Sequence, residues 1–179
     1  GPVGNRFLLP DDEQEVFGHD YLFMATGTGI APFRAMLREM LVLGNGIPES
    51  CQVRLFLGVK AHLDLLYDRE FRELAQRFPN SFKYAPVLSR SERTAEGGRK
   101  YVQHALMDDP DDIAALISGG RLRTYICGTA GMEDGIKGVL RSLALKGTHT
   151  DVLVLDREMV MNDDEIGVLH RSRLFIETY

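Results

Sequence analysis

The sequence predicts an α/β fold in which a doubly wound, mostly parallel sheet of five strands carries helices on both faces. Two observations lead to this prediction. Short apolar runs with strand character alternate along the chain with segments whose apolar residues recur at helical spacing, as expected for a parallel sheet covered on both sides. The chain also has 179 residues, of which 44% are hydrophobic, and this is enough for one domain with a proper core.

The first strand and the first helix are predicted near the start of the chain. The apolar run 21–24 is predicted to be a strand, and residues 25–34 form a glycine-rich turn that leads into a helix. From Phe33 onward, apolar residues recur at positions i, i+3, i+4, i+7 and i+8, which places them on one face of that helix. The helix is expected to end near Gly44 and Gly46.

The middle of the chain continues the alternation. Residues 53–57 are predicted to be a buried strand, and the apolar positions of 71–78 predict an amphipathic helix that Pro79 stops. Residues 82–88 are predicted to be the third strand. A loop rich in charge and glycine follows at 89–99.

The last part of the chain completes the predicted sheet. A helical stretch follows the charged loop, and Pro110 marks the entry of a helix over 111–117. Residues 124–127 are predicted to be a strand, and apolar positions between 132 and 143 line the helix after it. Residues 174–178 are expected to close the sheet.

Composition restricts the class of protein. The formal net charge of −5 and a sequence pI near 5.5 argue against a general nucleic-acid binder. No apolar run approaches the roughly 18 residues of a membrane span. Cys51 and Cys127 lie far apart, so we expect no disulfide and a reducing compartment such as the cytoplasm. The five histidines share no metal-ligand spacing with each other or with these cysteines, so we expect no metal.

The glycine-rich turn indicates a ligand. A strand, a glycine turn and a helix start present free backbone N–H groups to a phosphate, so the predicted ligand is a nucleotide. Gly27 and Gly29 let the backbone approach a pyrophosphate closely, and Pro32 suits the first helical turn because its missing donor is not needed there. The contacts predicted from this turn are Thr26, Gly27, Thr28, Gly29, Ile30, Ala31 and Pro32.

The turn alone leaves open a purely structural role as a strand-to-helix corner. Its spacing is G-x-G-x-x-P, and the next strand runs into Gly58-Val59-Lys60 without the acidic residue that holds a ribose in an NAD-type fold. In a doubly wound sheet, however, ligands bind at the carboxyl ends of the strands. The residues after the four predicted strands should therefore meet there, and they are 26–32, Gly58 and Val59, Ser89 and Arg90, and 127–133.

Taken together, these motifs resemble the NADP-binding domain of the plant-type ferredoxin–NADP⁺ reductase family, a Rossmann-like domain. The matching residues, in order, are 1–4, 25–34, 55–59, 65–67, Ser89-Arg90, 101–103, Cys127-Gly128-x-x-Gly131-Met132-Glu133 and Glu177-Thr178-Tyr179. The resemblance covers nearly the whole chain, and residues 146–173 depart from it. It implies that residues 20–179 form the NADP-binding domain and that residues 1–19 are an interdomain linker and lead-in.

The resemblance also implies which residues bind NADP(H). Ser89, Arg90 and Arg99 are expected to cradle the 2′-phosphate, because the forked donors and permanent charge of a guanidinium suit a dianion. Tyr101 is expected to stack on the adenine, with Gln103 beside it. The alternatives are a solvated charged loop and a tyrosine that only packs at a helix start. The other implied cofactor contacts are Gly58, Val59, Gly128, Met132 and Glu133.

The remaining implied residues form a redox end. Cys127 is expected beside the nicotinamide, with Thr28 nearby and Glu177 completing the site, and the role of the cysteine is positional rather than nucleophilic. Tyr179 is expected to stack on a flavin ring. Because no segment resembles the family's flavin-binding motif, we expect an FAD-binding domain upstream of Gly1.

The predicted function is that of the NADP(H)-binding part of an FAD-dependent reductase, which transfers hydride between NADPH and FAD and exchanges electrons with ferredoxin or another iron–sulfur protein. The fragment alone is expected to be inactive, and a plastid is the alternative to the cytoplasm for a photosynthetic source. Within the same class, the alternatives are the reductase component of a multicomponent oxygenase of the benzoyl-CoA epoxidase type and half of a diflavin reductase. Alternatives from other classes are a non-catalytic NADP-sensing module and an interaction domain with a vestigial pocket.

Overall fold

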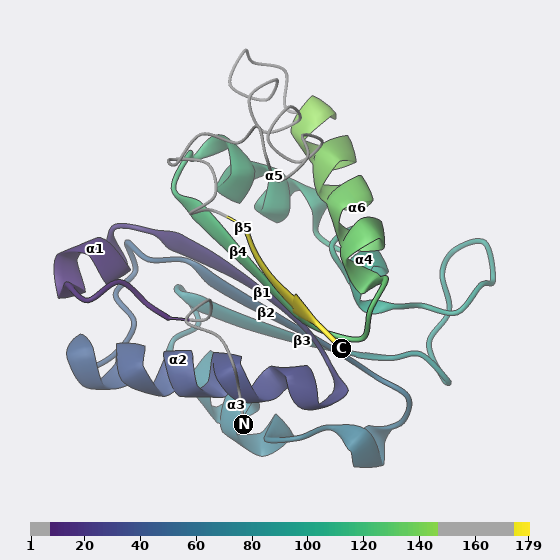
Figure 1. Ribbon diagram of the computed structural model, residues 1–179, viewed down its shortest axis with the longest axis horizontal. Coiled ribbons are helices and arrows are strands. Elements are labelled where there is room, and N and C mark those ends of the chain that lie inside the picture. Colours follow the sequence, from purple (N-terminus) through teal and green to yellow (C-terminus); the bar gives the residue numbers. More distant parts are fainter. Residues whose placement is uncertain (1–7, 147–173) are drawn as a thin grey trace.

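The computed structural model describes residues 8–146 and 174–179, and within them it shows a five-stranded sheet with helices on both faces (Figure 1). The strand order is β3-β2-β1-β4-β5, and the four pairings between neighbouring strands are parallel. The predicted doubly wound α/β fold is therefore confirmed. The strands are β1 (Asp20–Thr26), β2 (Val53–Val59), β3 (Phe82–Leu88), β4 (Leu122–Gly128) and β5 (Leu174–Thr178).

Two groups of helices cover the sheet. One face carries α1 (Glu13–Phe17), α2 (Ile30–Leu43) and α3 (Asp68–Arg77), and the other carries α4 (Val102–Ala105), α5 (Pro110–Ser118) and α6 (Met132–Lys146) (Figure 1). Two short 3₁₀ helices, η1 (Gly27–Gly29) and η2 (His62–Asp64), follow β1 and β2. Among the described residues, no helix is long and apolar enough to cross a membrane.

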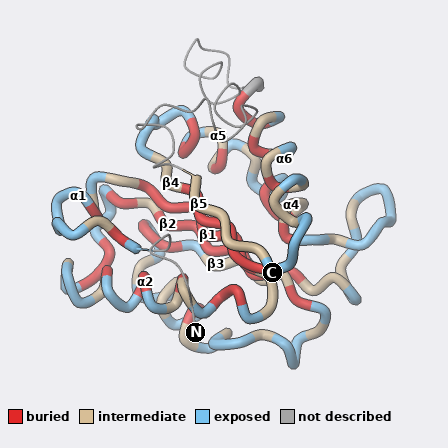
Figure 2. The backbone as a smooth tube through the Cα atoms, in the orientation of Figure 1, coloured by how far each residue is buried: buried red, intermediate tan, exposed pale blue. Residues whose placement is uncertain are grey.

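Side chains of the central strand β1 alternate between two cores. Tyr21 and Phe23 pack on the side of α2 and α3, whereas Leu22 and Met24 pack on the side of α5 and α6. All four side chains are fully buried, and Figure 2 shows buried backbone concentrated in the central strands. A strand that is buried on both faces has no polar alternation, which explains why 21–24 is a continuous apolar run in the sequence.

The predicted strands and helices are present, with ends that shift by a few residues. The sequence interpretation missed α1, a helix of 5 residues in which the N-cap Asp12 accepts a hydrogen bond from the Glu15 N–H at 3.0 Å. The Val16 side chain is fully buried, and its carbonyl accepts a hydrogen bond from the Tyr21 hydroxyl at 2.7 Å. Leu9 is buried as well. Residues of the predicted lead-in that the structure describes therefore pack against the domain.

A buried ion pair fixes α5 to the start of β2, at the edge of the sheet where the strands begin. Arg54 is 5% exposed, and its guanidinium donates to both carboxylate oxygens of Asp112, from Nε at 2.6 Å and from Nη2 at 2.9 Å. It also donates to the Ser81 carbonyl at 3.4 Å. The hydrogen bond from Arg54 holds the pKa of Asp112 below its usual range. The pair therefore joins a helix, a central strand and the loop before β3.

Replacing Asp112 should destabilise the fold strongly, because Asp112→Ala leaves the buried Arg54 charge uncompensated. We expect a loss of about 3 kcal/mol in the free energy of unfolding, measured in urea at pH 7. Asp111→Ala is the matched control on the same helical turn, and it should cost less than about 1 kcal/mol.

The same pair should make stability pH-dependent. A carboxyl whose folded pKa is depressed contributes stability above its unfolded pKa, about 3.9, and loses it as the pH falls through the folded value. The wild-type chain should therefore lose more stability than Asp112→Ala between about pH 5 and the folded pKa. Equal losses in the two proteins would contradict this assignment.

Candidate functional site

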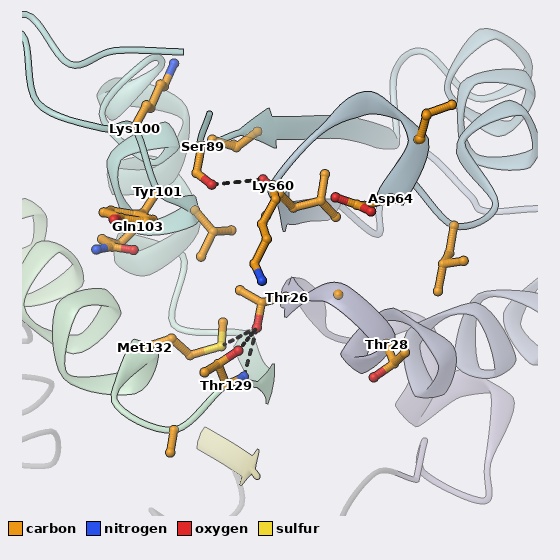
Figure 3. Close-up of a pocket in the computed structure, with 18 residues that line it drawn as sticks. Thr26, Thr28, Lys60, Asp64, Ser89, Lys100, Tyr101, Gln103, Thr129 and Met132 are labelled. Atoms are coloured by element: carbon orange, nitrogen blue, oxygen red, sulfur yellow. Dashed lines mark hydrogen bonds between the residues drawn. The ribbon is translucent and has the colours of Figure 1, made fainter. Parts of the chain in front are cut away.

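A pocket of about 770 Å³ lies at the carboxyl ends of the strands, and this volume is typical of small-molecule sites (Figure 3). Its walls come from the ends of β1, β2 and β3, the start of α4, and the loop between β4 and α6. In the sheet, β2 lies on one side of β1 and β4 on the other. The connections after β1 and β4 therefore diverge, and this leaves a crevice at the switch in strand order.

The structure places the predicted cofactor residues in two groups. Those that line the pocket are Thr26, Gly27, Thr28, Gly58, Val59, Ser89, Tyr101, Gln103 and Met132. Those that do not line it are Gly29, Ile30, Ala31, Pro32, Arg90, Arg99, Gly128 and Glu133. Thr129 and Ala130 line the pocket from the strand-end segment 127–133, and Leu66 and Val102 from the matching motifs 65–67 and 101–103, although none of them was named as a cofactor contact. The lining residues that sequence analysis missed are Lys60, Leu63, Asp64, Val87 and Lys100.

The glycine turn packs tightly against the end of β4. Gly29 is buried, and a Cβ at this position would overlap the backbone carbonyl of Cys127. Gly29 therefore acts as packing beneath the site, while Gly27 and Thr28 form the surface that faces the pocket. Ile30 is fully buried under the turn, which explains why its side chain supports the pocket without lining it.

Thr26 connects the glycine turn to the loop after β4. Its hydroxyl oxygen accepts a hydrogen bond from the Thr129 N–H at 2.8 Å and lies 3.4 Å from the Met132 Sδ, to which it can donate (Figure 3). Gly128 has φ +150°, and a Cβ there would overlap the Thr26 side chain. The predicted Gly128 thus acts by making room for Thr26, and Thr26 in turn holds one wall of the pocket.

The opposite wall combines a fixed hydroxyl with an exposed aromatic ring. Both the backbone N–H and the hydroxyl of Ser89 donate to the Val59 carbonyl, at 2.9 Å and 3.2 Å. Tyr101 caps α4, and its N–H donates to the His104 Nδ1 at 2.9 Å, but its side chain stays 45% exposed at the pocket. An exposed tyrosine face beside a cavity is suited to stack on a planar base.

The two arginines of the expected 2′-phosphate cradle lie outside the lining of the pocket. Arg90 and Arg99 are exposed and do not line the pocket, whereas Lys60 and Lys100 do. Arg99 forms an isolated antiparallel bridge with Arg93, and the next residue, Lys100, lines the pocket. The Lys100 ammonium donates to Asp108 at 2.6 Å.

The predicted redox residues lie next to the pocket, beside its glycine turn. Cys127 and Glu177 are register partners in the β4–β5 pairing. Burial, and secondarily the Glu177 charge, raises the pKa of the Cys127 thiol to about 11, so the thiol is neutral at physiological pH. Tyr179 is 65% exposed, and its hydroxyl oxygen lies 2.7 Å from the Thr28 hydroxyl oxygen. Its N–H donates to the Gly128 carbonyl at 2.9 Å, which extends the strand pairing.

Among the residues that the structure describes, no group of three or more His, Cys, Asp or Glu side chains is placed to hold a metal ion. Glu133 is half-buried at the start of α6, and its Oε2 has no hydrogen-bond partner among the described residues.

The doubly wound sheet and the pocket at its switch in strand order define the class of nucleotide-binding α/β domains. A family model for the oxidoreductase NAD-binding domain matches residues 23–138, and the chain belongs to this family. Within it, the predicted resemblance to ferredoxin–NADP reductases is confirmed by sequence relatives. The chloroplastic embryo isozyme of Oryza sativa subsp. japonica is 38% identical over 147 residues, and the Spirulina sp. enzyme is 39% identical over 140 residues.

These relatives are longer than the chain. The two matches cover 80% and 76% of the chain, but only 37% of the rice enzyme and 45% of the Spirulina enzyme. A solved structure of a histidine-to-leucine mutant of ferredoxin–NADP⁺ reductase from Plasmodium falciparum aligns with a TM-score of 0.68 at 20% identity, covering 99% of this chain and 58% of that one. The same mutant with 2′P-AMP aligns with a TM-score of 0.66, also at 20% identity, covering 96% of this chain and 56% of that one. These two likenesses support the fold.

The packing of Gly29 predicts a sharp difference between two glycine-to-alanine substitutions. Gly29→Ala should cost about 1–3 kcal/mol of unfolding free energy, because the new methyl group meets backbone that cannot move aside easily. Gly138→Ala, on the exposed face of α6 with open space around it, should stabilise the chain by about 0.5–1 kcal/mol through helix propensity. Urea unfolding measures both, and a stable Gly29→Ala would disprove the tight contact.

Proposed function

We propose that this chain is the NADP(H)-binding domain of an FAD-dependent reductase that transfers hydride between NADPH and FAD and exchanges electrons with ferredoxin or another iron–sulfur protein. The observation that carries the proposal is the meeting of the glycine turn, the Ser89 hydroxyl and the exposed Tyr101 ring in one pocket at the switch in strand order. Backbone N–H groups, a polar anchor and an aromatic face are the groups that a dinucleotide requires.

The pocket suggests how the dinucleotide is oriented. The Tyr101 ring binds the adenine, and Ser89 with Lys100 binds the 2′-phosphate, with the exposed Arg90 and Arg99 adding positive charge from the loop. The pyrophosphate lies on the glycine turn. This arrangement directs the nicotinamide away from Tyr101 and toward the Thr28 side of the turn, where Cys127 and Tyr179 lie.

The residues at that end position the ring and exclude water from the reacting face. The neutral Cys127 thiol offers a small polarisable surface without charge, and the β5 pairing keeps Glu177 beside it. FAD, when bound by a domain that we place before Gly1, supplies the hydride acceptor or donor. The exposed ring of Tyr179 fits the flavin face, and its hydroxyl is held by Thr28 until the nicotinamide takes its place.

The partners and the location belong to the same proposal. The relatives are named as ferredoxin–NADP reductases and include chloroplastic enzymes, so we place the parent protein in the cytoplasm or a plastid with a ferredoxin-like partner.

The proposal predicts a preference for nucleotides with a 2′-phosphate. Two charge-assisted contacts at about 1.5–3 kcal/mol each should make NADP⁺ bind about two to four decades more tightly than NAD⁺ in calorimetric titrations of this chain. 2′-AMP should likewise bind more tightly than 5′-AMP. Ser89→Ala combined with Lys100→Met should lower this preference by at least about tenfold and leave NAD⁺ affinity unchanged.

The control for this experiment is Arg77→Ala. It also removes one positive charge. Arg77 is the last residue of α3, which runs away from the carboxyl edge of the sheet, so Arg77 lies far from the pocket. Equal affinities of the wild-type chain for NADP⁺ and NAD⁺ would contradict the 2′-phosphate assignment. Absence of binding to either nucleotide would favour an interaction domain with a vestigial pocket.

A further inference from the structure

Lys60 lies at the centre of the pocket and was not among the expected cofactor residues. It follows directly after β2, in the position where an NAD-type fold would be expected to offer an acidic residue. Figure 3 shows its side chain crossing the pocket, with the ammonium directed toward Thr26 and away from Ser89 and Lys100. A positive charge is thus held over the glycine turn.

The backbone on either side of Lys60 is fixed. The Val59 carbonyl accepts the Ser89 N–H at 2.9 Å, and the Lys60 carbonyl accepts the Arg90 N–H at 3.1 Å. In the β1–β2 register, Gly58 is the partner of Thr26, so Lys60 stands two residues beyond that pair. Its long side chain can therefore extend back over the turn while its main chain remains tied to the β3 side.

The Lys60 ammonium differs from the other pocket cation in its partners. Lys100 donates to Asp108 at 2.6 Å and lies 3.8 Å from Glu92, so its charge is shared with two carboxylates. Lys60 is exposed and takes part in no ion pair within residues 8–146 and 174–179. The carboxylate that lines the same pocket, Asp64, accepts the Ala61 N–H at 3.0 Å. The Lys60 charge remains available for an anion.

We infer that Lys60 is the cation that binds the pyrophosphate bridge of the dinucleotide above the glycine turn. The inference rests on the proposed function and extends it to Lys60, whose contribution to nucleotide affinity can be distinguished from that of Ser89. Both NADP⁺ and NAD⁺ contain the bridge, whereas 2′-AMP does not. Lys60 therefore sets the affinity for dinucleotides in general, and the residues around Ser89 set the preference for the 2′-phosphate.

The test is a calorimetric comparison of the wild-type chain, Lys60→Gln and Lys60→Arg with three probes, NADP⁺, NAD⁺ and 2′-AMP. Lys60→Gln removes the charge but keeps a polar, unbranched side chain one atom shorter, and it should weaken both dinucleotides by the same factor of about ten, as for the loss of one charge-assisted contact. Its affinity for 2′-AMP should stay within about twofold of wild type. Lys60→Arg should retain most of the dinucleotide affinity, since the charge is kept.

Each outcome separates this inference from the proposed function. Because Lys60 is exposed, thermal unfolding of Lys60→Gln should match wild type, and Arg77→Gln controls for the change in net charge. Wild-type binding of NADP⁺ with unchanged affinity in Lys60→Gln overturns the role of Lys60 and leaves the proposed function standing. A loss confined to NADP⁺ and 2′-AMP would move Lys60 to the 2′-phosphate. A wild-type chain that binds no dinucleotide overturns both.

Discussion

The close approach of the glycine turn to the end of β4 is the constraint on which the rest of the structure depends. Gly29 meets the Cys127 carbonyl on one side, and Gly128 meets the Thr26 side chain on the other, so neither position leaves room for a Cβ. This contact joins β1 to β4 where the strand order switches direction. The contact holds β1 and β4 together at their carboxyl ends, while the connections that follow these two strands diverge. The pocket is the space that remains between them, and its shape follows from backbone geometry more than from any single lining residue.

Charge is distributed unequally between the two edges of the sheet. At the amino edge, carboxylates and cations neutralise each other: Asp112 binds Arg54, and Asp20 binds Arg121 at 3.0 Å. At the carboxyl edge, the lining cation Lys60 has no such partner in the described part of the chain. A protein with a formal net charge of −5 thus keeps a local positive centre where parallel strands and the first turn of α2 already favour an anion. The amino edge stabilises the fold, and the carboxyl edge is left to a ligand.

How much of this could be predicted from the sequence depends on burial. A strand buried on both faces, such as β1, is a continuous apolar run in the sequence, whereas the edge strand β3 was predicted at its observed bounds because Pro79 and the charged loop enclose it. The glycine turn was also predictable, because its backbone conformation requires particular residue types. The direction of individual side chains was not predictable, since it depends on contacts between distant segments that no local sequence pattern reveals. Arg99 is exposed while the next residue, Lys100, lines the pocket, and the short helix α1 depends on one Asp12 cap and one buried Val16.

The edge strand β5 shows how the proposed redox end depends on the same scaffold. Its register sets Glu177 opposite Cys127, and the Gly128 carbonyl then accepts the Tyr179 N–H, so the loop that supports Thr26 also positions the last residues of the strand. The Tyr179 hydroxyl reaches the Thr28 hydroxyl from this position. A ring that entered between Thr28 and Cys127 would have to displace the Tyr179 hydroxyl from the Thr28 hydroxyl and from the Thr26 carbonyl, 3.4 Å away. The Cys127–Glu177 pairing would stay intact. The cost of such an exchange is small, since an exposed hydrogen bond contributes about 1 kcal/mol. The geometry therefore allows the ring of Tyr179 to move without disturbing the strand that carries it.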